Sequence, residues 1–313
     1  MPKIAVVQKP PVLLDRAATI ALATASLAEA AGEGASLVVF PEAFIPGYPS
    51  WVWRLKPGGD MALASEIHAR LRANAVSIAA GDLVPLCEAA LRHQVTVLCG
   101  INELDAEFSG TTLFNSTVLI GPNGAILNTH RKLIPTNPER MIWGRGDARG
   151  LKVVDTPVGR VGCLICWENY MPLARYALYA QNLEIHVAPT WDCGEDWVAS
   201  MRHIAREGGC WVVGTGTAIQ AGDVPKNFPG REQLFGNGDE WLCEGGAVVV
   251  RPLGKIAAGP LMREKGILYC EIDRDAAPRS RRSLDVAGHY SRPDIFQLNV
   301  NRAAMPAVTF HDV

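Results

Sequence analysis

Short runs of β-branched residues alternate with Ala- and Leu-rich stretches along most of the chain, and this alternation limits what the chain can fold into. In the first half, strands are expected at residues 3–8, 37–40, 95–101, 113–121 and 125–132. Helices are expected at about 60–80 and 83–93, and from Asp15, a favourable N-cap residue, to Gly32. Strands that alternate with helices predict an α/β protein in which helices cover the sheets.

The second half of the chain repeats this pattern. Strands are expected at 152–155, 160–166, 184–188 and 210–214, and helices near 172–181 and 197–207. The segments STVLIGPNGAI (116–126) and GAVVVRPLGKI (246–256) align without gaps, and each predicts a hairpin closed by a Pro-x-Gly turn. This internal similarity predicts two similar halves packed together. Because no Ser/Gly-rich or Pro-rich linker separates them, we expect one domain over residues 1–275, followed by a C-terminal extension over 276–313.

Composition narrows the class of protein and its partners. The 313 residues are 48% hydrophobic and 20% charged, which is typical of a well-packed globular protein. The 30 Lys and Arg against 32 Asp and Glu give a net charge of −2 without charged blocks, which argues against nucleic acid or an anionic membrane surface as the main partner. No stretch reaches the ~20 apolar residues of a membrane helix, and MPKIAVVQKP does not read as a signal peptide. With only eight cysteines, a cytoplasmic protein with reduced thiols is expected.

Three residues with catalytic potential follow predicted strands, namely Glu42, Lys132 and Cys166. The carboxyl ends of strands are where sites assemble in open α/β sheets. A free thiol has a pKa of ~8.5, so a nucleophilic Cys166 needs a base or a cation nearby. Glu42 could take the thiol proton and return one to a leaving nitrogen, and Lys132 could stabilise developing charge. Taken singly, these residues also fit a surface carboxylate, a solvated hairpin end and an inert small hydrophobe.

Other chemistries have weaker support in the sequence. Cys163 and Cys166 form a C-x-x-C pair, as in redox and zinc sites, but no second C-x-x-C and no His-x-x-x-His completes a metal set. Because successive strand residues point to opposite faces, we expect Cys163 in the core on the face opposite Cys166. The chain lacks a complete dinucleotide-binding glycine motif and a G-x-S-x-G elbow, so nucleotide binding and serine hydrolysis are not expected.

A series of motifs covers nearly the whole chain: FPEAFIPGYP (40–49), HRKLIPTNPER with MIWGRGD (130–147), CWENYMPLAR (166–175), APTWD (188–192), EGGAVV (244–249) and DVAGHYSRPDIFQL (285–298). In these motifs and their order the chain resembles the nitrilase superfamily, and within it the true nitrilase branch. The resemblance implies a four-layer αββα sandwich of two pseudo-symmetric halves. It also implies an active site built from Glu, Lys and Cys.

Roles carry over from the family to matching positions of this chain. The resemblance implies that Cys166 is the nucleophile, Glu42 the general base and Lys132 a donor that stabilises the tetrahedral intermediate. Glu139 matches a second glutamate that positions the lysine and the substrate. The backbone N–H of Trp167, next to the nucleophile, would be the other stabilising donor.

Aromatic residues near the motifs are candidates for the substrate pocket, since small-ligand pockets are mostly apolar with a few polar groups. By resemblance, Tyr48 and Trp191 are expected to bind substrate, together with Trp167. The alternative is that these side chains are ordinary core aromatics.

The resemblance implies a nitrilase that converts an organic nitrile to a carboxylic acid and ammonia through a Cys thioimidate and thioester, without a metal or organic cofactor. An amidase of the same superfamily and a cyanide-degrading enzyme are the alternatives, and a non-catalytic binding protein on this fold is a further one. The extension carries apolar residues suited to an oligomer contact, so a homodimer or a larger homo-oligomer is expected. These residues are Tyr290, Ile295, Phe296 and Leu298.

Overall fold

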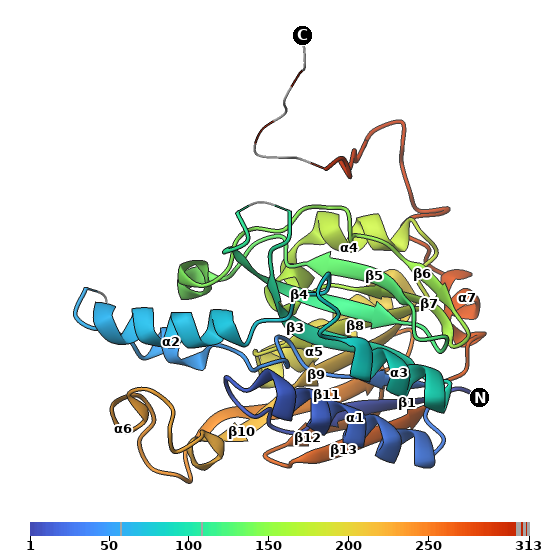
Figure 1. Ribbon diagram of the computed structural model, residues 1–313. Helices are drawn as coiled ribbons and strands as arrows, with labels where there is room; N and C mark the ends of the chain where they lie inside the picture. Colours follow the sequence, from blue (N-terminus) through green and yellow to red (C-terminus); the bar gives the residue numbers. More distant parts are fainter. Residues whose placement is uncertain (57, 108, 305–307, 309–310, 312–313) are drawn as a thin grey trace.

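The computed structural model describes residues 1–56, 58–107, 109–304, 308 and 311 (Figure 1). Its first sheet has the strand order β13-β1-β2-β3-β4-β5. These strands are β1 (Lys3–Gln8), β2 (Leu37–Val39), β3 (Thr96–Leu104), β4 (Leu113–Ile120), β5 (Ile126–Arg131) and β13 (Gly266–Glu271). β1, β2 and β3 are parallel, whereas β4, β5 and β13 each run antiparallel to their neighbours.

The second sheet repeats this arrangement. Its strands are β6 (Val154–Thr156), β7 (Gly159–Cys163), β8 (Ile185–Thr190), β9 (Trp211–Gly216), β10 (Ala218–Gln220), β11 (Trp241–Val250) and β12 (Ile256–Met262). β7, β8 and β9 are parallel, β11 and β12 continue antiparallel as β4 and β5 do, and β6 pairs with β7 as β13 pairs with β1. Both predicted hairpins, β4–β5 and β11–β12, are therefore present, at equivalent places in two similar halves.

Helices cover the outer face of each sheet. α1 (Arg16–Gly32) and α3 (Val84–His93) pack on the first sheet, and α4 (Pro172–Tyr179) and α5 (Glu195–Gly208) pack on the second. The inner faces of the two sheets meet in a common apolar layer. This confirms the expected four-layer αββα sandwich of two pseudo-symmetric halves. Among the described residues, no helix has the length and apolar character needed to cross a membrane.

The remaining elements are α2 and several short helices in the connections between strands and after the last strand. They are η1 (Ser50–Trp53), α2 (Met61–Ala73), η2 (Asn137–Met141), η3 (Cys166–Tyr170), η4 (Ala221–Asp223), α6 (Arg231–Leu234) and α7 (Ala276–Arg281). α7 packs on the body, where Ser280 Oγ donates to the Gly209 carbonyl oxygen at 3.1 Å. Beyond α7 the chain extends away from the sheets (Figure 1), and Tyr290, Ile295 and Phe296 are exposed there.

The strand expected at residues 160–166 is shorter than predicted, and this changes the position of Cys166. β7 ends at Cys163, and Cys166 begins η3 with a φ of 52°. The alternation of faces stops with the strand, so the expectation that Cys163 and Cys166 lie on opposite faces is wrong. Both pack in the apolar layer between the sheets.

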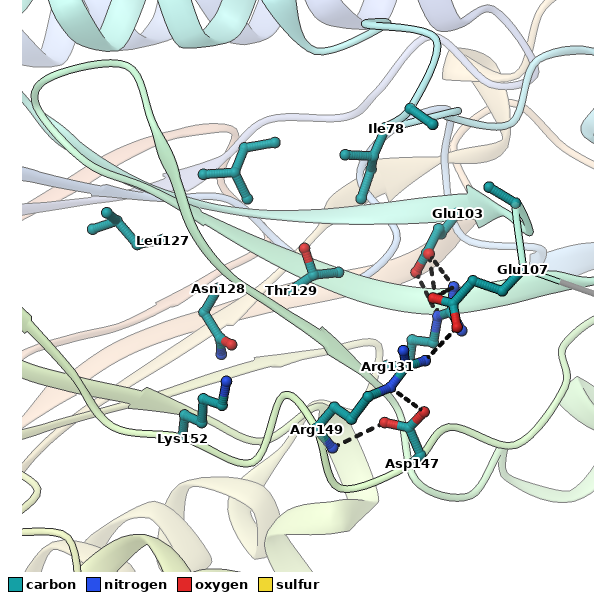
Figure 2. Close-up of a pocket in the computed structure, with 13 residues that line it drawn as sticks. Ile78, Glu103, Glu107, Leu127, Asn128, Thr129, Arg131, Asp147, Arg149 and Lys152 are labelled. Carbon is teal, nitrogen blue, oxygen red and sulfur yellow. Dashed lines mark hydrogen bonds and ion pairs between the residues drawn. The ribbon is translucent and has the colours of Figure 1, made fainter. Parts of the chain in front are cut away.

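A charged cavity of about 510 Å³ lies beside β5, outside the apolar layer (Figure 2). Its charged side chains other than Lys152 pair with one another. Arg131 lies 2.5 Å from Glu103, and Arg149 lies 2.9 Å from Glu107 and 2.8 Å from Asp147. Among the described residues that line this cavity there is neither a thiol nor an aromatic ring, so it lacks the features predicted for the site.

Candidate active site

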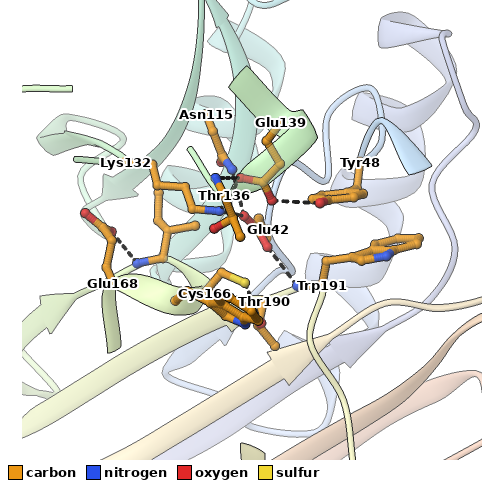
Figure 3. Close-up of polar contacts among 12 residues, drawn as sticks. Glu42, Tyr48, Asn115, Lys132, Thr136, Glu139, Cys166, Glu168, Thr190 and Trp191 are labelled. Atoms are coloured by element: carbon orange, nitrogen blue, oxygen red, sulfur yellow. Dashed lines mark hydrogen bonds and ion pairs between the residues drawn. The ribbon is translucent and has the colours of Figure 1, made fainter. Parts of the chain in front are cut away.

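Four residues from three separate parts of the sequence meet at one end of the two sheets (Figure 3). Glu42 follows β2, Lys132 follows β5, Glu139 lies in η2 and Cys166 begins η3. All four side chains are buried, with at most 4% of each residue exposed. The structure therefore brings together the four residues predicted to be catalytic.

The Glu42 carboxylate accepts a hydrogen bond from each of three different segments. Its Oε1 accepts from Lys132 Nζ at 2.8 Å and from Asn115 Nδ2 at 2.7 Å, and its Oε2 accepts from the Trp191 backbone N–H at 2.7 Å. Burial raises the pKa of Glu42 above its usual 4.5, and the Lys132 ammonium offsets only part of that rise. A carboxylate in this state can hold and release a proton closer to neutral pH than an exposed one.

The Lys132 ammonium lies between two carboxylates. Its Nζ donates to Glu42 Oε1 and to Glu139 Oε2, each at 2.8 Å. Burial by itself lowers the pKa of Lys132, but the charges of Glu42, Cys166 and Glu139 outweigh burial and raise the net pKa above its usual 10.5. Lys132 is thus a fixed cation that cannot serve as a base at neutral pH.

Glu139 forms hydrogen bonds with both Lys132 and Tyr48. Its Oε2 also accepts from the Thr136 backbone N–H at 2.7 Å, and its Oε1 accepts from the Tyr48 hydroxyl at 2.7 Å. Burial, followed by the neighbouring carboxylates, raises the pKa of Tyr48 well above its usual 10, so the hydroxyl stays protonated and donates. These bonds hold the Glu139 carboxylate in one orientation.

The Cys166 thiol lies on a strained turn. A φ of 52° places this residue in the left-handed region, which costs energy for a side chain other than glycine. Its Sγ accepts a hydrogen bond from Thr190 Oγ1 at 3.1 Å. Burial and the Glu42 charge raise the pKa of Cys166 to about 12, and Lys132 opposes this rise. The resting group is therefore a thiol, and it needs a base when it reacts.

Glu168 joins the turn that holds Cys166 to the turn that holds Lys132. Its Oε2 accepts from the Ile165 backbone N–H at 2.6 Å, and its Oε1 accepts from the Leu133 backbone N–H at 2.7 Å. His130 Nε2 lies 3.0 Å from the same carboxylate. A single buried carboxylate thus fixes the residues adjacent to both Cys166 and Lys132.

A cavity of about 250 Å³ opens beside the thiol, and Cys166 and Glu139 line it. Tyr48 and Trp191, both of which also line it, stack with their ring centroids 4.4 Å apart and their planes 7° apart. Trp167 lines the cavity as well, but 45% of it is exposed, and its Nε1 donates to Asp192 Oδ2 at 2.9 Å. All three residues predicted to bind substrate therefore border the same cavity.

Some residues of the site were missed by sequence reasoning, namely Asn115, Thr136, Glu168 and Thr190. Asn115 begins a run of three polar residues (115–117) within strand β4, and this run is the signal that could have found it. Glu168 and Thr190 lie inside the CWENYMPLAR and APTWD motifs, beside residues that were singled out. Across the described residues, no group of three or more His, Cys, Asp or Glu is arranged to hold a metal ion.

Comparisons with known proteins agree with this geometry. The family of carbon-nitrogen hydrolases matches residues 3–282. Nitrilase 3 of Arabidopsis thaliana is 39% identical over 315 residues, which cover 98% of this chain and 89% of that protein. An aliphatic nitrilase of Sinorhizobium fredii (strain HH103) is 39% identical over 305 residues, which cover 97% of each chain.

A solved structure supports the fold. The crystal structure of a carbon-nitrogen hydrolase from Helicobacter pylori G27 aligns with a TM-score of 0.69 at 22% identity, over 90% of this chain and 93% of that chain. The fold, the matched family and the full-length relatives lead to one assignment: the chain belongs to the carbon-nitrogen hydrolases of the nitrilase superfamily, within the true nitrilase branch.

Proposed function

We propose that this chain is a nitrilase that hydrolyses an organic nitrile to the carboxylic acid and ammonia. The observation that carries the proposal is the buried, ion-paired group of Glu42, Lys132 and Glu139 beside a cavity that Glu139 and Cys166 line. The similarity to named nitrilases over nearly the full chain supports the same reaction. Nitrile hydrolysis needs a nucleophile, a base and a cationic donor, and the three are provided by Cys166, Glu42 and Lys132.

In the first half of the reaction, the Cys166 thiol loses its proton to Glu42 as its sulfur attacks the nitrile carbon. The nitrile nitrogen takes up a proton, and a thioimidate results. Because the thiol pKa is raised to about 12, proton transfer to Glu42 has to accompany the attack. Lys132 and the backbone N–H of Trp167 donate to the charge that develops on the substrate.

In the second half, Glu42 activates a water molecule that adds to the thioimidate. The tetrahedral intermediate expels ammonia and leaves a thioester on Cys166. A second water then releases the carboxylic acid and restores the thiol. The role of Glu139 is to hold Lys132 and Tyr48 in place through its two oxygens.

The substrate binds against the stacked rings of Tyr48 and Trp191, with Trp167 at the rim. A cavity of about 250 Å³ limits the reacting portion of the substrate to a small organic group. The rings offer an apolar surface, which suits a neutral nitrile better than a charged molecule.

Two alternatives use the same residues. If the thiol leaves at the first tetrahedral stage, the product is an amide, and an amidase needs the same thiol, base and ammonium. A cyanide-degrading enzyme is a narrower alternative. Pocket shape decides among them, so product analysis is required.

The decisive experiment incubates the protein with a panel of nitriles and their matching amides and measures acid, amide and ammonia. Acid and ammonia from nitriles support the proposal, whereas turnover of amides alone supports the amidase. Cys166→Ala should be inactive. Cys163→Ala is the matched control, because it removes a buried thiol from the same apolar layer and should keep activity. Full activity in Cys166→Ala contradicts the assignment.

We also propose a homo-oligomer, a dimer or a larger assembly, formed through residues 276–313 outside a hydrolase domain at 1–275. Exposed apolar side chains in this extension support a contact with a second copy of the chain. They include Tyr290, Ile295, Phe296 and Leu298. Sedimentation velocity of the full chain and of a variant that ends at Ser283 tests this. A full-length protein that stays monomeric contradicts it.

The proposed compartment is the cytoplasm. All eight cysteines lie within the described residues and are free thiols, as in a reducing environment. Fractionation of the source cells, followed by immunodetection, tests this assignment, and recovery outside the cytosolic fraction contradicts it.

A further inference from the structure

Besides Cys166, one further thiol lines the same cavity, and another cysteine lies next to it. Cys193 follows β8, is partly exposed and lines the cavity that Cys166 also lines. Cys243 lies behind it in β11 and is buried, with 3% exposed. The Trp191 carbonyl oxygen, two residues before Cys193 in the chain, lies 3.5 Å from Cys243 Sγ, and a side-chain hydrogen bond joins the Cys193 and Cys243 thiols. Neither cysteine has a role in the proposed hydrolysis.

We propose that Cys193 and Cys243 are an oxidation site, at which a hydroperoxide converts the two thiols to a reversible disulfide that stops catalysis. The Cys193 thiolate attacks the terminal oxygen of the peroxide, so that an S–O bond forms and the O–O bond breaks. Cys243 then attacks the resulting sulfenic acid, its proton goes to the departing hydroxide, and water leaves. With hydrogen peroxide, two thiols are oxidised to one disulfide and the peroxide is reduced to two waters.

Of the two thiols that line the cavity, Cys193 has the surroundings that favour reaction with a peroxide. The hydrogen bond from Cys243, assisted by one from the Glu244 backbone, lowers the pKa of Cys193 to about 6. Burial raises the pKa of Cys166 to about 12. Only a thiolate reacts readily with a peroxide. At neutral pH, Cys193 is therefore the thiolate of this cavity, and Cys166 is not.

The segment that carries Cys193 also contacts the catalytic residues. The Trp191 N–H donates to Glu42 at 2.7 Å, and the Thr190 hydroxyl donates to Cys166 at 3.1 Å. The Trp191 carbonyl oxygen lies 3.5 Å from Cys243 Sγ. A disulfide needs an S–S distance of about 2.05 Å, which is much shorter than an S–H···S contact. Closing it pulls residues 190–193 toward β11 and disturbs both Glu42 and Cys166.

The disulfide is tested without reference to activity. The full-length wild type and Cys166→Ala are treated with hydrogen peroxide, the remaining thiols are alkylated, and the unreduced digest is analysed by mass spectrometry. We expect a cross-linked peptide that joins Cys193 and Cys243 in both proteins, lost on reduction by dithiothreitol. Because Cys166→Ala lacks the proposed nucleophile, this result is independent of whether the chain is a nitrilase.

The effect on catalysis rests on the proposed function and is measured separately. Peroxide should remove more than half of the wild-type activity, and dithiothreitol should restore it. In Cys193→Ser and Cys243→Ser this restorable loss should disappear, with thermal melting used to check that each variant is folded. Cys87→Ser is the matched control, since Cys87 is also partly buried but its pKa is raised by burial. It should behave as the wild type.

Three results overturn the inference. One is the absence of the cross-link after peroxide treatment of the folded protein. Another is a cross-link from Cys193 to Cys166 in place of Cys243. The third is formation of the Cys193–Cys243 disulfide with unchanged activity, which overturns the proposed effect on catalysis.

Discussion

Thr190 Oγ1 donates a hydrogen bond to Cys166 Sγ across 3.1 Å, and the same hydroxyl accepts from the Asp192 backbone N–H at 2.8 Å. The bond from Asp192 fixes the orientation of the hydroxyl, whose own proton points to the Cys166 sulfur. Its bond lowers the pKa of Cys166 against the larger effect of burial. The end of β8 therefore helps to stabilise negative charge on the thiol.

Replacing this hydroxyl should slow catalysis without unfolding the protein. In Thr190→Val the developing thiolate loses a hydrogen bond worth about 1.5–3 kcal/mol, so kcat/KM should fall about tenfold or more. Thr190→Ser keeps the hydroxyl and should retain most of the activity. Steady-state kinetics on both variants checks this. A loss of activity in Thr190→Ser together with retained activity in Thr190→Val would show that the methyl group, not the hydroxyl, is what the site requires.

Lys132→Met should destabilise the fold as well as abolish activity. It leaves Glu42 and Glu139 buried without their shared cation, and breaking a buried pair typically costs about 3–5 kcal/mol. Urea unfolding measures the loss. Adding Glu42→Gln removes one unpaired charge, so the double variant should regain stability but no activity. A single variant as stable as the wild type would contradict the energetic role of the buried pair.

Activity should fall on the acid side at a pH above 4.5, the usual value for glutamate. Burial raises the pKa of Glu42, so the carboxylate gains its proton early as the pH falls and can no longer accept the thiol proton. The folded state binds this proton more tightly than the unfolded state does, so protonation of Glu42 favours the fold at low pH. The acid loss in kcat/KM should therefore be reversible. A pH–rate profile, measured with circular dichroism at each pH, checks this. An acid-side midpoint at or below pH 4.5 in kcat/KM contradicts it.

Much of the fold was predictable because local signals agree with the global structure. Residues 3–8 form β1 as expected, and Asp15 caps α1, its Oδ1 accepting from the Ala18 N–H at 2.9 Å. β-branched runs buried on both faces and a strong N-cap need no tertiary information to be recognised. Glu42, Lys132 and Cys166 were candidates because they follow predicted strands, whereas Glu139 was identified only by family resemblance. The structure shows that the four side chains lie close together.

The remainder depends on contacts between segments distant in sequence. Asn115 reaches Glu42 from β4, and Thr190 reaches Cys166 from β8, so neither partner is visible from local pattern. Cys166 was expected at the end of a strand, but it adopts a φ of 52°. The turn is held by Glu168, which binds backbone on both sides of the site. Such strain is stable only when the surrounding structure fixes it.

Glu168→Gln should test that restraint. A carboxamide has one acceptor oxygen where the carboxylate has two, so either the Ile165 or the Leu133 N–H loses its partner. A buried donor left unsatisfied costs about 1–3 kcal/mol. We expect lower stability and a fall in kcat with little change in KM, because Glu168 positions Cys166 and does not touch substrate. A rise in KM alone, measured with a good nitrile, would contradict a positioning role.

Trp191→Ala should change substrate preference more than it changes the fold. The ring stacks on Tyr48 at 4.4 Å and forms a wall of the cavity, whereas the bond to Glu42 comes from the Trp191 backbone N–H and survives truncation. Removing the ring enlarges the pocket, so relative kcat/KM should shift toward bulkier nitriles. Trp197→Ala provides the contrast, since this tryptophan is a core residue with 1% exposed, and its loss should lower stability by about 3–5 kcal/mol. Competition assays with paired small and bulky nitriles, together with thermal melting, separate the two effects. An unchanged substrate profile combined with loss of soluble Trp191→Ala protein would mean that Trp191 is a core aromatic and not a specificity residue.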